Sequence, residues 1–491
     1  MARRPYYIEL YRTLPIIVLA ATLGLVLFLA IVLKGEASRR FSRWAIGAGL
    51  TAAIAAAVGL YPATGIGTGT DLIGRSIVFD PLFLFMTVFL SVYFLGILIL
   101  SPALWPKDLW EWPVFWALLL GSLIGMILLA STRHLIFFAV AFELASLPSY
   151  VLVGFRRRNA KAAEGAAKYA VFGAVCSAVM VYGISLLYGL TGSFDVQIIA
   201  GHLAGGPLQA AATVALLCLL VGIGFKISLV PMHFWSPDAF EAAGADICAW
   251  LSVASKSAAL VALARFVHLL ASPAGDAFHH NLVVALATLS IATMTVGNLS
   301  AYWQTSVKRL LAYSSIAHAG YITCAVAALA GAEGGAAVVA YLLVYLLMNL
   351  GAFAVTGLVE QQTGSDHLSH FAGLSTQSPK LAALMMFFLF SLVGLPPLAG
   401  FAVKWILLAV LWQHQLPVLV VAVLANTLLS LFFYMRIARA MYFEDTRTPP
   451  IIAPRSVDWL LTACACALLV LFLGWGYLNS FARGLFAVAF Q

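Results

Sequence analysis

The stretch GFKISLVP, residues 224–231, places a lysine and then a proline inside an apolar segment that is long enough to cross a membrane. A charge at the centre of a bilayer costs about 3 kcal/mol on insertion scales, so charged residues there are rare and mark ion or proton pathways. Proline removes a backbone donor and clashes with the preceding turn, so we expect the helix to break near Pro231. Broken helices at membrane depth are tolerated where the freed carbonyls line a cavity or meet water. The stretch therefore predicts a broken membrane helix with a protonatable group, Lys226, beside the break.

A second stretch of the same kind is GLPPLAGFAVK, residues 394–404, in which Pro396 and Pro397 are followed by Lys404. It predicts a second broken helix with its own lysine. Two further ionisable residues, Lys256 and Glu143, lie in unbroken apolar segments. These four residues are the strongest candidates for function.

Composition indicates a membrane protein throughout. Of the 491 residues, 63% are hydrophobic and 9% are charged, whereas soluble proteins carry about 25% charged residues. Apolar windows of about 20 residues, the length that spans hydrocarbon, recur from end to end. The fourteen windows are centred near residues 23, 52, 90, 121, 143, 178, 218, 258, 289, 319, 347, 396, 428 and 468. We therefore expect an all-α polytopic membrane protein of about 14 transmembrane helices, the first retained rather than cleaved as a signal peptide.

Other classes of function find little support in the composition. The net charge of +8 is not concentrated on one basic face, so no nucleic-acid partner is predicted. The six cysteines are scattered through apolar segments without metal-ligand spacing, so we read them as small buried hydrophobes. No metal site and no cofactor-binding site is predicted in this chain.

The basic residues predict the topology. Alternate loops carry most of the lysines and arginines, for example residues 34–43, 156–168 and 436–455. Because cytoplasmic loops are enriched in these residues, both termini should face away from the cytoplasm of a bacterial-type inner membrane. Arg3, Arg4 and Arg12 argue against this orientation, but the basic residues of the opposite loops are more numerous.

Matching offsets suggest an internal repeat. Glu143 lies 175 residues before His318, and Lys226 lies 178 residues before Lys404. A repeat unit of five helices has an odd number of spans, so the second copy would be inverted, as in many transporters. We predict N-terminal helices 1–3 at residues 1–110, a first repeat at 111–272, a second repeat at 273–445 and a last helix at 446–491.

The residue types suit a proton relay. A desolvated ammonium gives up its charge readily, and a nearby carboxylate opposes that loss, so Glu143 is the natural modulator of Lys226. The alternative is a static Glu–Lys pair that orients helices. His318 is either a bridge between Lys256 and Lys404 or a hydrogen-bonded core histidine. His233, just after the break at Pro231, is as readily structural.

Lys168 stands two turns into the sixth span, after a charged loop. It is either an interfacial anchor whose ammonium reaches back to the membrane surface or a member of the proton uptake path. The sequence leaves both readings open.

Several motifs carry a family resemblance. Listed by residue range, they are FEL at 142–144, EGAAKY at 164–169, GFKIS at 224–228, VPMHFW at 230–235, VKRLLAYSSIAHAGY at 307–321 and GLPPLAGF at 394–401. Over roughly residues 75–445 the chain resembles the antiporter-like membrane subunits of proton-pumping NADH:quinone oxidoreductase, respiratory complex I, and is most similar to the chain N type. A lysine at position 404 fits that type better than the related chain M, which carries a glutamate there.

The resemblance implies inverted five-helix repeats with a coupled pair (Glu143 and Lys226), a central relay (Lys256) and an exit-side lysine (Lys404). It also implies that quinone, NADH, flavin and iron–sulfur clusters are held by partner subunits, and that the partners are other membrane-arm chains and lipid. The segment at 241–247 departs from the family pattern: two prolines are absent and Asp246 has entered. This departure puts the local geometry before Lys256 in doubt.

Two rival functions remain at this stage. A subunit of a multi-subunit Na⁺/H⁺ antiporter would share the repeat and the lysines. A membrane-arm scaffold that conducts no ions would keep the helices without the transport.

Overall fold

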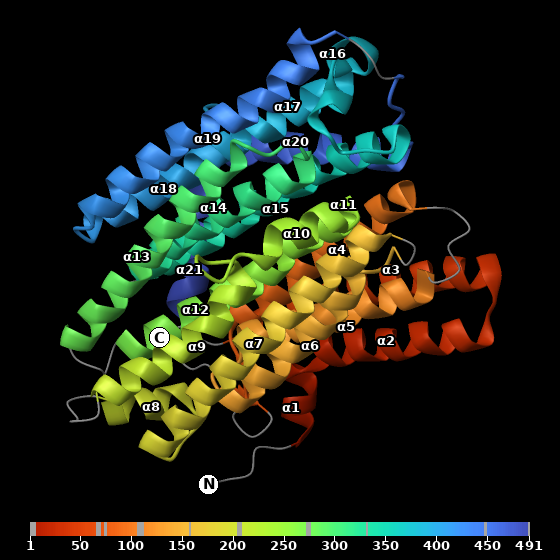
Figure 1. Cartoon of the computed structure of the whole chain (residues 1–491). Helices are drawn as coiled ribbons and strands as arrows, with labels where there is room; N and C mark the ends of the chain where they lie inside the picture. Colours follow the sequence, from red (N-terminus) through yellow and green to blue (C-terminus); the bar gives the residue numbers. More distant parts are fainter. Residues whose placement is uncertain are drawn as a thin grey trace.

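The computed structural model describes residues 6–64, 70–72, 76–105, 112–156, 159–203, 209–271, 276–329, 332–445 and 449–489. Within these ranges the chain is almost entirely helical, and the long helices run roughly parallel to one another (Figure 1). Thirteen helices are long and apolar enough to cross a membrane. A fourteenth crossing is divided into two shorter apolar helices, α17 and α18. The prediction of an all-α polytopic membrane protein with about 14 spans is confirmed.

The N-terminal part begins with a hairpin of two helices that lies at one side of the molecule (Figure 1). Its two helices are less buried than those that follow. The buried share of the most apolar 18 residues is 22% in α2 and 33% in α3, against 78% in both α4 and α5. The elements are α1 (Tyr6–Arg12), α2 (Leu14–Val32), α3 (Gly35–Leu60), the 3₁₀ turn η1 (Tyr61–Ala63) and α4 (Pro81–Leu104). A short antiparallel ladder, β1 (Thr70–Leu72) with β2 (Ile77–Phe79), precedes α4 and was not expected from the sequence.

The first predicted repeat comprises the helices from α5 to α12. They are α5 (Trp112–Ser131), α6 (Leu135–Val153), α7 (Ala160–Thr191), α8 (Val196–Leu203), α9 (Gln209–Ile227), α10 (Trp235–Ala242), α11 (Ala245–Trp250), the π turn η2 (Leu251–Ser255) and α12 (Lys256–Ala271). The seventh span is broken between α9 and α10, as Pro231 predicts. The eighth span, residues 245–270, has all of its window residues buried.

The second predicted repeat comprises the helices from α13 to α19, and two more helices follow. They are α13 (Asp276–Ala301), α14 (Val307–Ala327), α15 (Ala332–Thr363), η3 (Leu368–Phe371), α16 (Leu374–Gln377), α17 (Pro379–Val393), α18 (Ala399–Gln413), α19 (Pro417–Phe443), α20 (Arg455–Leu473) and α21 (Trp475–Ala489). The twelfth span breaks at Pro396 and Pro397, as predicted. The division into two repeats stays a prediction.

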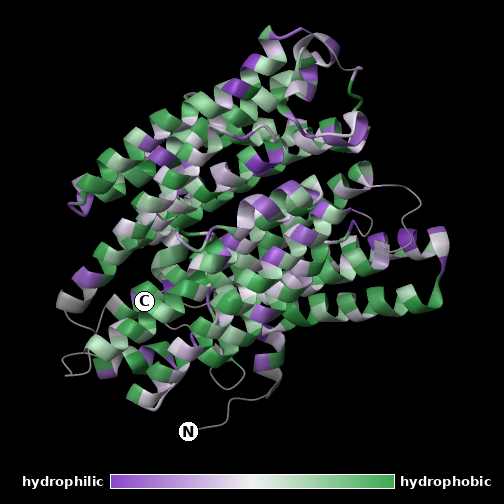
Figure 2. Cartoon of the chain, in the orientation of Figure 1, coloured by the Kyte–Doolittle hydropathy of each residue, from purple (hydrophilic) through white to green (hydrophobic). Residues whose placement is uncertain are grey.

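The core lies where the two predicted repeats meet. Helix α14 contacts α10, α12, α15, α18 and α19, and 94% of its window residues are buried. Figure 2 shows that the hydrophilic residues gather mainly at helix ends and loops, whereas the helix bodies are largely hydrophobic. A polar side chain in the middle of α14 therefore has to find its partner among the neighbouring helices.

Candidate functional site

The first helix break satisfies its carbonyls from its own chain. Helix α9 ends at Ile227, and Ser228 takes a positive φ of 67°. The Ser228 amide and the Trp235 indole N–H both donate to the Phe225 carbonyl, at 3.1 and 2.9 Å. The Leu229 amide donates to the Gly224 carbonyl at 2.7 Å. These bonds leave the ammonium of the adjacent lysine to find a side-chain partner.

That partner is a serine one helical turn from the candidate carboxylate. Lys226 is fully buried; its Nζ donates to Ser146 Oγ at 2.8 Å and lies 5.5 Å from the centre of the Phe142 ring. Glu143 precedes Ser146 by three residues on α6, so the two face the same side of that helix. The Ser177 hydroxyl donates to the Glu143 carboxylate. Among the described residues Glu143 and Lys226 form no direct ion pair, and each binds a serine instead.

Lys256 follows a π turn in the middle of a membrane span. Leu251–Ser255 form this turn, and Lys256 begins α12 directly after it. Such π-bulges inside helices are frequently found at functional sites. Lys256 is 2% exposed, and its Nζ donates to Ser315 Oγ of α14 at 2.7 Å. Sequence analysis identified Lys256 but not the π turn, because no proline marks it.

Helix α14 carries a polar stripe from Lys256 toward Lys404. Ser315, His318 and Tyr321 recur at intervals of three residues and so share one face of the helix. His318 is 2% exposed; its Nδ1 lies 2.8 Å from the Tyr341 hydroxyl. Its Nε2 lies 3.5 Å from the Tyr434 hydroxyl. The imidazole of His318 thus lies between two tyrosine hydroxyls, in the part of α14 that separates the contacts of Lys256 and Lys404.

Lys404 binds the backbone of the second break. Helix α17 ends at Val393, and the Lys404 Nζ donates to the carbonyls of Val393 at 2.7 Å and Leu392 at 3.3 Å. These carbonyls lie at the negative end of the α17 dipole. The ammonium also lies 4.7 Å from the centre of the Tyr321 ring. Lys404 therefore contacts the polar stripe of α14.

His233 and Lys168, for each of which the sequence allowed two roles, lie in different surroundings. His233 is 7% exposed, its ring centre lies 4.5 Å from that of Phe234, and its Nδ1 has no hydrogen-bond partner among the described residues. Lys168 pairs with Asp238 and with Glu164, each at 2.8 Å. Arg309 also pairs with Asp238, at 2.7 Å. Burial raises the pKa of Asp238, but Lys168 and Arg309 outweigh it and hold that pKa below its usual range.

Several buried hydroxyl oxygens have no hydrogen-bond partner among the described residues. They include those of Ser228, Ser236 and Ser257. Buried polar groups are normally hydrogen-bonded, and a water commonly provides the partner where protein does not. These serines lie within ten residues of Lys226 or Lys256 in the sequence.

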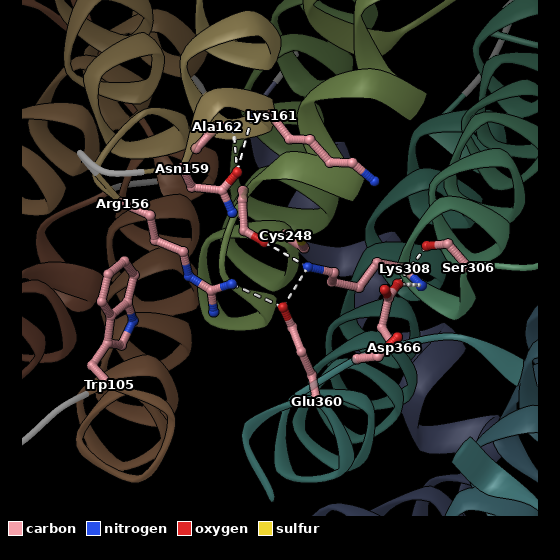
Figure 3. Close-up of polar contacts among 12 residues, drawn as sticks. Trp105, Arg156, Asn159, Lys161, Ala162, Cys248, Ser306, Lys308, Glu360 and Asp366 are labelled. Atoms are coloured by element: carbon pink, nitrogen blue, oxygen red, sulfur yellow. Dashed lines mark hydrogen bonds and ion pairs between the residues drawn. The ribbon is translucent and has the colours of Figure 1, made fainter. Parts of the chain in front are cut away.

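Sequence analysis missed an ionic cluster that joins the two predicted repeats. Figure 3 shows Glu360 of α15 between Arg156, which follows α6, and Lys308 of α14, with both distances 2.9 Å. The Lys308 Nζ also donates to the Ala243 carbonyl at 2.9 Å. The Lys308 side chain is only 3% exposed, so this lysine is a buried cation that joins helices.

The altered segment before Lys256 places an acidic side chain inside the protein. Asp246 of α11 is fully buried and accepts a hydrogen bond from the Trp105 indole at 2.8 Å. Glu241 pairs with Arg309 at 2.7 Å. The acid that departs from the family pattern therefore anchors α11 to the end of α4 through Trp105.

A second buried ion pair was also missed. Arg265 lies within α12 and is 2% exposed. It pairs at 2.7 Å with Asp80, the N-cap of α4. The error has a simple cause: an arginine near the end of an apolar window looks the same in sequence whether it faces solvent or a carboxylate.

Known proteins resemble this chain over most of its length. Residues 132–430 match the family described as NADH:quinone oxidoreductase/Mrp antiporter, TM. NADH-quinone oxidoreductase subunit N of Rubrobacter xylanophilus is 36% identical over 474 residues, which cover 94% of this chain and 95% of the relative. Its counterpart in Anaeromyxobacter sp. (strain Fw109-5) is 39% identical over 388 residues, covering 74% and 75%. A chain in the structure of respiratory complex I from Thermus thermophilus with bound Aureothin is 31% identical, with a TM-score of 0.77 and coverage of 95% and 98%.

Proposed function

This chain belongs to the NADH:quinone oxidoreductase/Mrp antiporter membrane family, as a proton-translocating subunit of the chain N type, and we propose that its protons pass along Lys226, Lys256 and Lys404. One observation carries the proposal. Ser315 binds Lys256, the His318 ring lies 5.6 Å from the Tyr321 ring, and the Tyr321 ring lies beside Lys404, so the three residues of α14 follow one another between the two lysines. Ionisable groups at membrane depth with hydroxyl partners are the usual elements of proton relays.

Glu143 is proposed as the group that switches the first lysine. Its carboxylate sits one helical turn from Ser146, the acceptor of the Lys226 ammonium. The Glu143 side chain is only partly buried in the isolated chain, so a neighbouring subunit can approach it. A change of charge there would alter how strongly Lys226 holds its proton.

Proton uptake is proposed near Lys168, where a cavity of about 190 Å³ opens between α7, α10 and α14. Lys168 and Asp238 both line it. His233 is proposed as an accessory group, because its unpartnered Nδ1 lies beside the broken segment at Pro231. The ion pairs of Lys168 support its role as an interfacial anchor equally, and the variant Asp238→Asn separates the two roles.

The wider setting is also a proposal. Redox cofactors, NADH and quinone are assigned to partner subunits, and the neighbours would be other antiporter-like and small hydrophobic chains. The membrane is proposed to be a bacterial-type inner membrane with both termini on the non-cytoplasmic side.

Neither of the two rival functions is favoured. An Na⁺/H⁺ antiporter subunit would share the fold, but the relatives above at 36% and 39% identity are subunits N. A scaffold without ion conduction does not require three buried lysines, each with its own polar partner.

The test is proton pumping by the whole complex in sealed vesicles. Lys226→Ala should abolish most NADH-driven proton uptake and lower the coupled quinone reduction. The matched control is Lys380→Ala, which removes an exposed lysine paired with Asp458 on the surface and should change neither rate. If Lys226→Ala pumps like the wild type in a fully assembled complex, the relay proposal is wrong and the scaffold reading replaces it.

A further inference from the structure

A cavity of about 630 Å³ lies at the start of α3, far from the relay residues in sequence. Its wall is formed by Glu36, Arg39, Arg40, Arg43, Trp44 and Gly47 of α3 and by Leu98 of α4. In Figure 2 the first turns of α3 carry the hydrophilic colour, whereas the adjoining α2 is hydrophobic along its length. The cavity therefore sits where a polar helix end meets an apolar surface.

The three arginines form one stripe along the helix. Positions 36, 39, 40, 43 and 47 follow the spacing i, i+3, i+4, i+7 and i+11, which places them on one face of an α-helix. At 1.5 Å per residue, the stripe extends for roughly 16 Å along the axis. Its length covers the headgroup region of one leaflet and the first part of the hydrocarbon.

Two of the three arginines carry positive charge that no described residue balances. Arg40 and Arg43 make no ion pair and no hydrogen bond with any described residue, and Glu36 is the one acidic residue among the described residues of the cavity wall. Arg39 lies with its guanidinium 5.5 Å from the centre of the Trp112 ring. A guanidinium is always charged and presents a planar fork that matches the oxygens of a phosphate. The unbalanced arginines therefore favour an anion with phosphate geometry.

The deeper end of the cavity is apolar. A Cβ added to Gly47 would meet only Leu98 Cδ2, at 3.9 Å, so the absent side chain leaves open space there. Trp44 is 71% exposed and Phe41 is 55% exposed on the same helix start. Amphipathic aromatic rings prefer the membrane interface. The wall thus changes from cationic to apolar along α3, as a lipid changes from headgroup to acyl chain.

We propose that this cavity binds one anionic phospholipid, with its phosphate on Arg40 and Arg43 and the start of an acyl chain along Gly47 and Leu98. By the predicted topology this is the cytoplasmic side, where anionic lipids attract basic residues near membrane-spanning helices. The lipid would fill the outer face of the α2–α3 hairpin against α4. Zwitterionic lipids fit less well because their positive group meets the arginines.

The test uses the whole complex in nanodiscs that contain a photo-crosslinkable phosphatidylglycerol or, separately, a photo-crosslinkable phosphatidylcholine. After illumination, labelled peptides of this chain are mapped by mass spectrometry. Phosphatidylglycerol should label the peptide that spans residues 35–60, and phosphatidylcholine should label it several-fold less. The double variant R40Q/R43Q should reduce the phosphatidylglycerol label about tenfold, because each basic residue near an anionic surface contributes substantially to binding.

Two further variants make the test specific. Arg455→Gln removes an exposed arginine at the start of α20 and should leave the label unchanged. Gly47→Leu keeps every arginine but fills the apolar end of the cavity, and it should lower the label as well. All variants are compared at equal assembly and equal NADH:quinone activity, so a folding defect is detected separately.

Three results would overturn the proposal. They are equal labelling by the neutral lipid, undiminished labelling in R40Q/R43Q, and crosslinks from this helix start to another subunit in place of lipid. The last result would assign the arginines to a protein partner. None of these results bears on proton transfer through Lys226, so the two proposals fail separately.

Discussion

The lysines beside the two helix breaks are held in different ways. Lys226 stands before its break and donates to a side chain, Ser146, with the carboxylate of Glu143 one turn away. Lys404 stands after its break and donates to two backbone carbonyls at the end of α17. A carboxylate can change its charge, whereas a helix dipole is fixed. From this difference we propose that the charge of Glu143 switches the first lysine, whereas the second lysine receives protons in a constant field.

The partners nevertheless follow the predicted repeat. Ser146 comes three residues after Glu143, and Tyr321 comes three residues after His318. Lys226 binds Ser146, and Lys404 lies over the Tyr321 ring. Each lysine therefore meets the same position of the corresponding helix, although the chemistry at that position differs.

The largest effect is expected from removing either ammonium. Lys226→Met and Lys404→Met should each lower proton pumping about tenfold or more, because a serial relay fails when one proton carrier is lost. Lys404→Met should also be less stable than Lys226→Met by about 1–3 kcal/mol, since it leaves two buried carbonyls without a donor. Ser146 keeps its own bond to the Phe142 carbonyl at 2.6 Å.

Vesicle pumping assays and thermal inactivation of the assembled complex measure the two quantities. Equal stability of the two variants would show that the carbonyl contacts of Lys404 are not essential. The proposed difference between the two halves would then be wrong.

A smaller effect is expected at the corresponding positions Glu143 and His318. Glu143→Gln keeps the hydrogen bond from Ser177 but removes the charge, and pumping should fall about fivefold, equivalent to about 1 kcal/mol of electrostatic coupling. His318→Gln should fall less, because the hydroxyls of Tyr341 and Tyr434 remain. Initial pumping rates at equal assembly decide the order. A larger loss for His318→Gln would place the switch in the second half instead.

A still smaller effect on pumping is expected from the serines that accept hydrogen bonds from the lysines. Ser146→Ala and Ser315→Ala remove the acceptors of Lys226 and Lys256. Because water replaces a lost hydroxyl at modest cost, each variant should retain pumping to within about two- to threefold. Ser430→Ala is a control, since its buried hydroxyl bonds only to the Thr427 carbonyl on its own helix. A tenfold loss for either relay serine would make the hydroxyl a proton carrier in its own right.

The smallest effect is expected at the surface cluster around Asp238. Asp238→Asn removes the negative charge shared by Lys168 and Arg309 and should lower stability by no more than about 1 kcal/mol, the range of partly exposed ion pairs. The Asp238 pKa is depressed in the folded protein. Its contribution is therefore fully present above its unfolded pKa of about 4 and is lost as the pH falls through the folded value. The difference between wild type and variant should be constant from about pH 5 to 8 and shrink below about pH 4.

The same variant separates the two readings of Lys168. If Lys168 is an anchor, pumping by Asp238→Asn stays at the wild-type rate across that range. If Lys168 belongs to the uptake path, the pumping rate falls while the stability difference stays small.

Much of the fold could be predicted because apolar length and proline are local signals. Each of the fourteen predicted windows falls on a helix or on a pair of helices of the structure. The breaks at Pro231 and at Pro396–Pro397 are confirmed, since proline acts on its own helix. The π turn before Lys256 was not predicted, because its cause is packing rather than a residue type.

The polar partners could not be predicted from the sequence. Glu360 lies 204 residues from Arg156 and 52 from Lys308, and no local pattern joins them. Arg265 and Asp80 are 185 residues apart. Which faces of distant helices meet depends on their rotation, and that is set by the packing of many side chains at once.

The sequence by itself determined a membrane protein with two broken helices, a set of buried ionisable residues and the family to which they belong. These features follow from the cost of placing charge and unpaired backbone in hydrocarbon, which constrains each span separately. Only the tertiary structure decided that Lys226 meets Ser146, that Lys256 meets Ser315 and that Lys404 meets the end of α17. Those contacts join separate helices, so they exist only once the bundle has fixed the rotation and depth of every span.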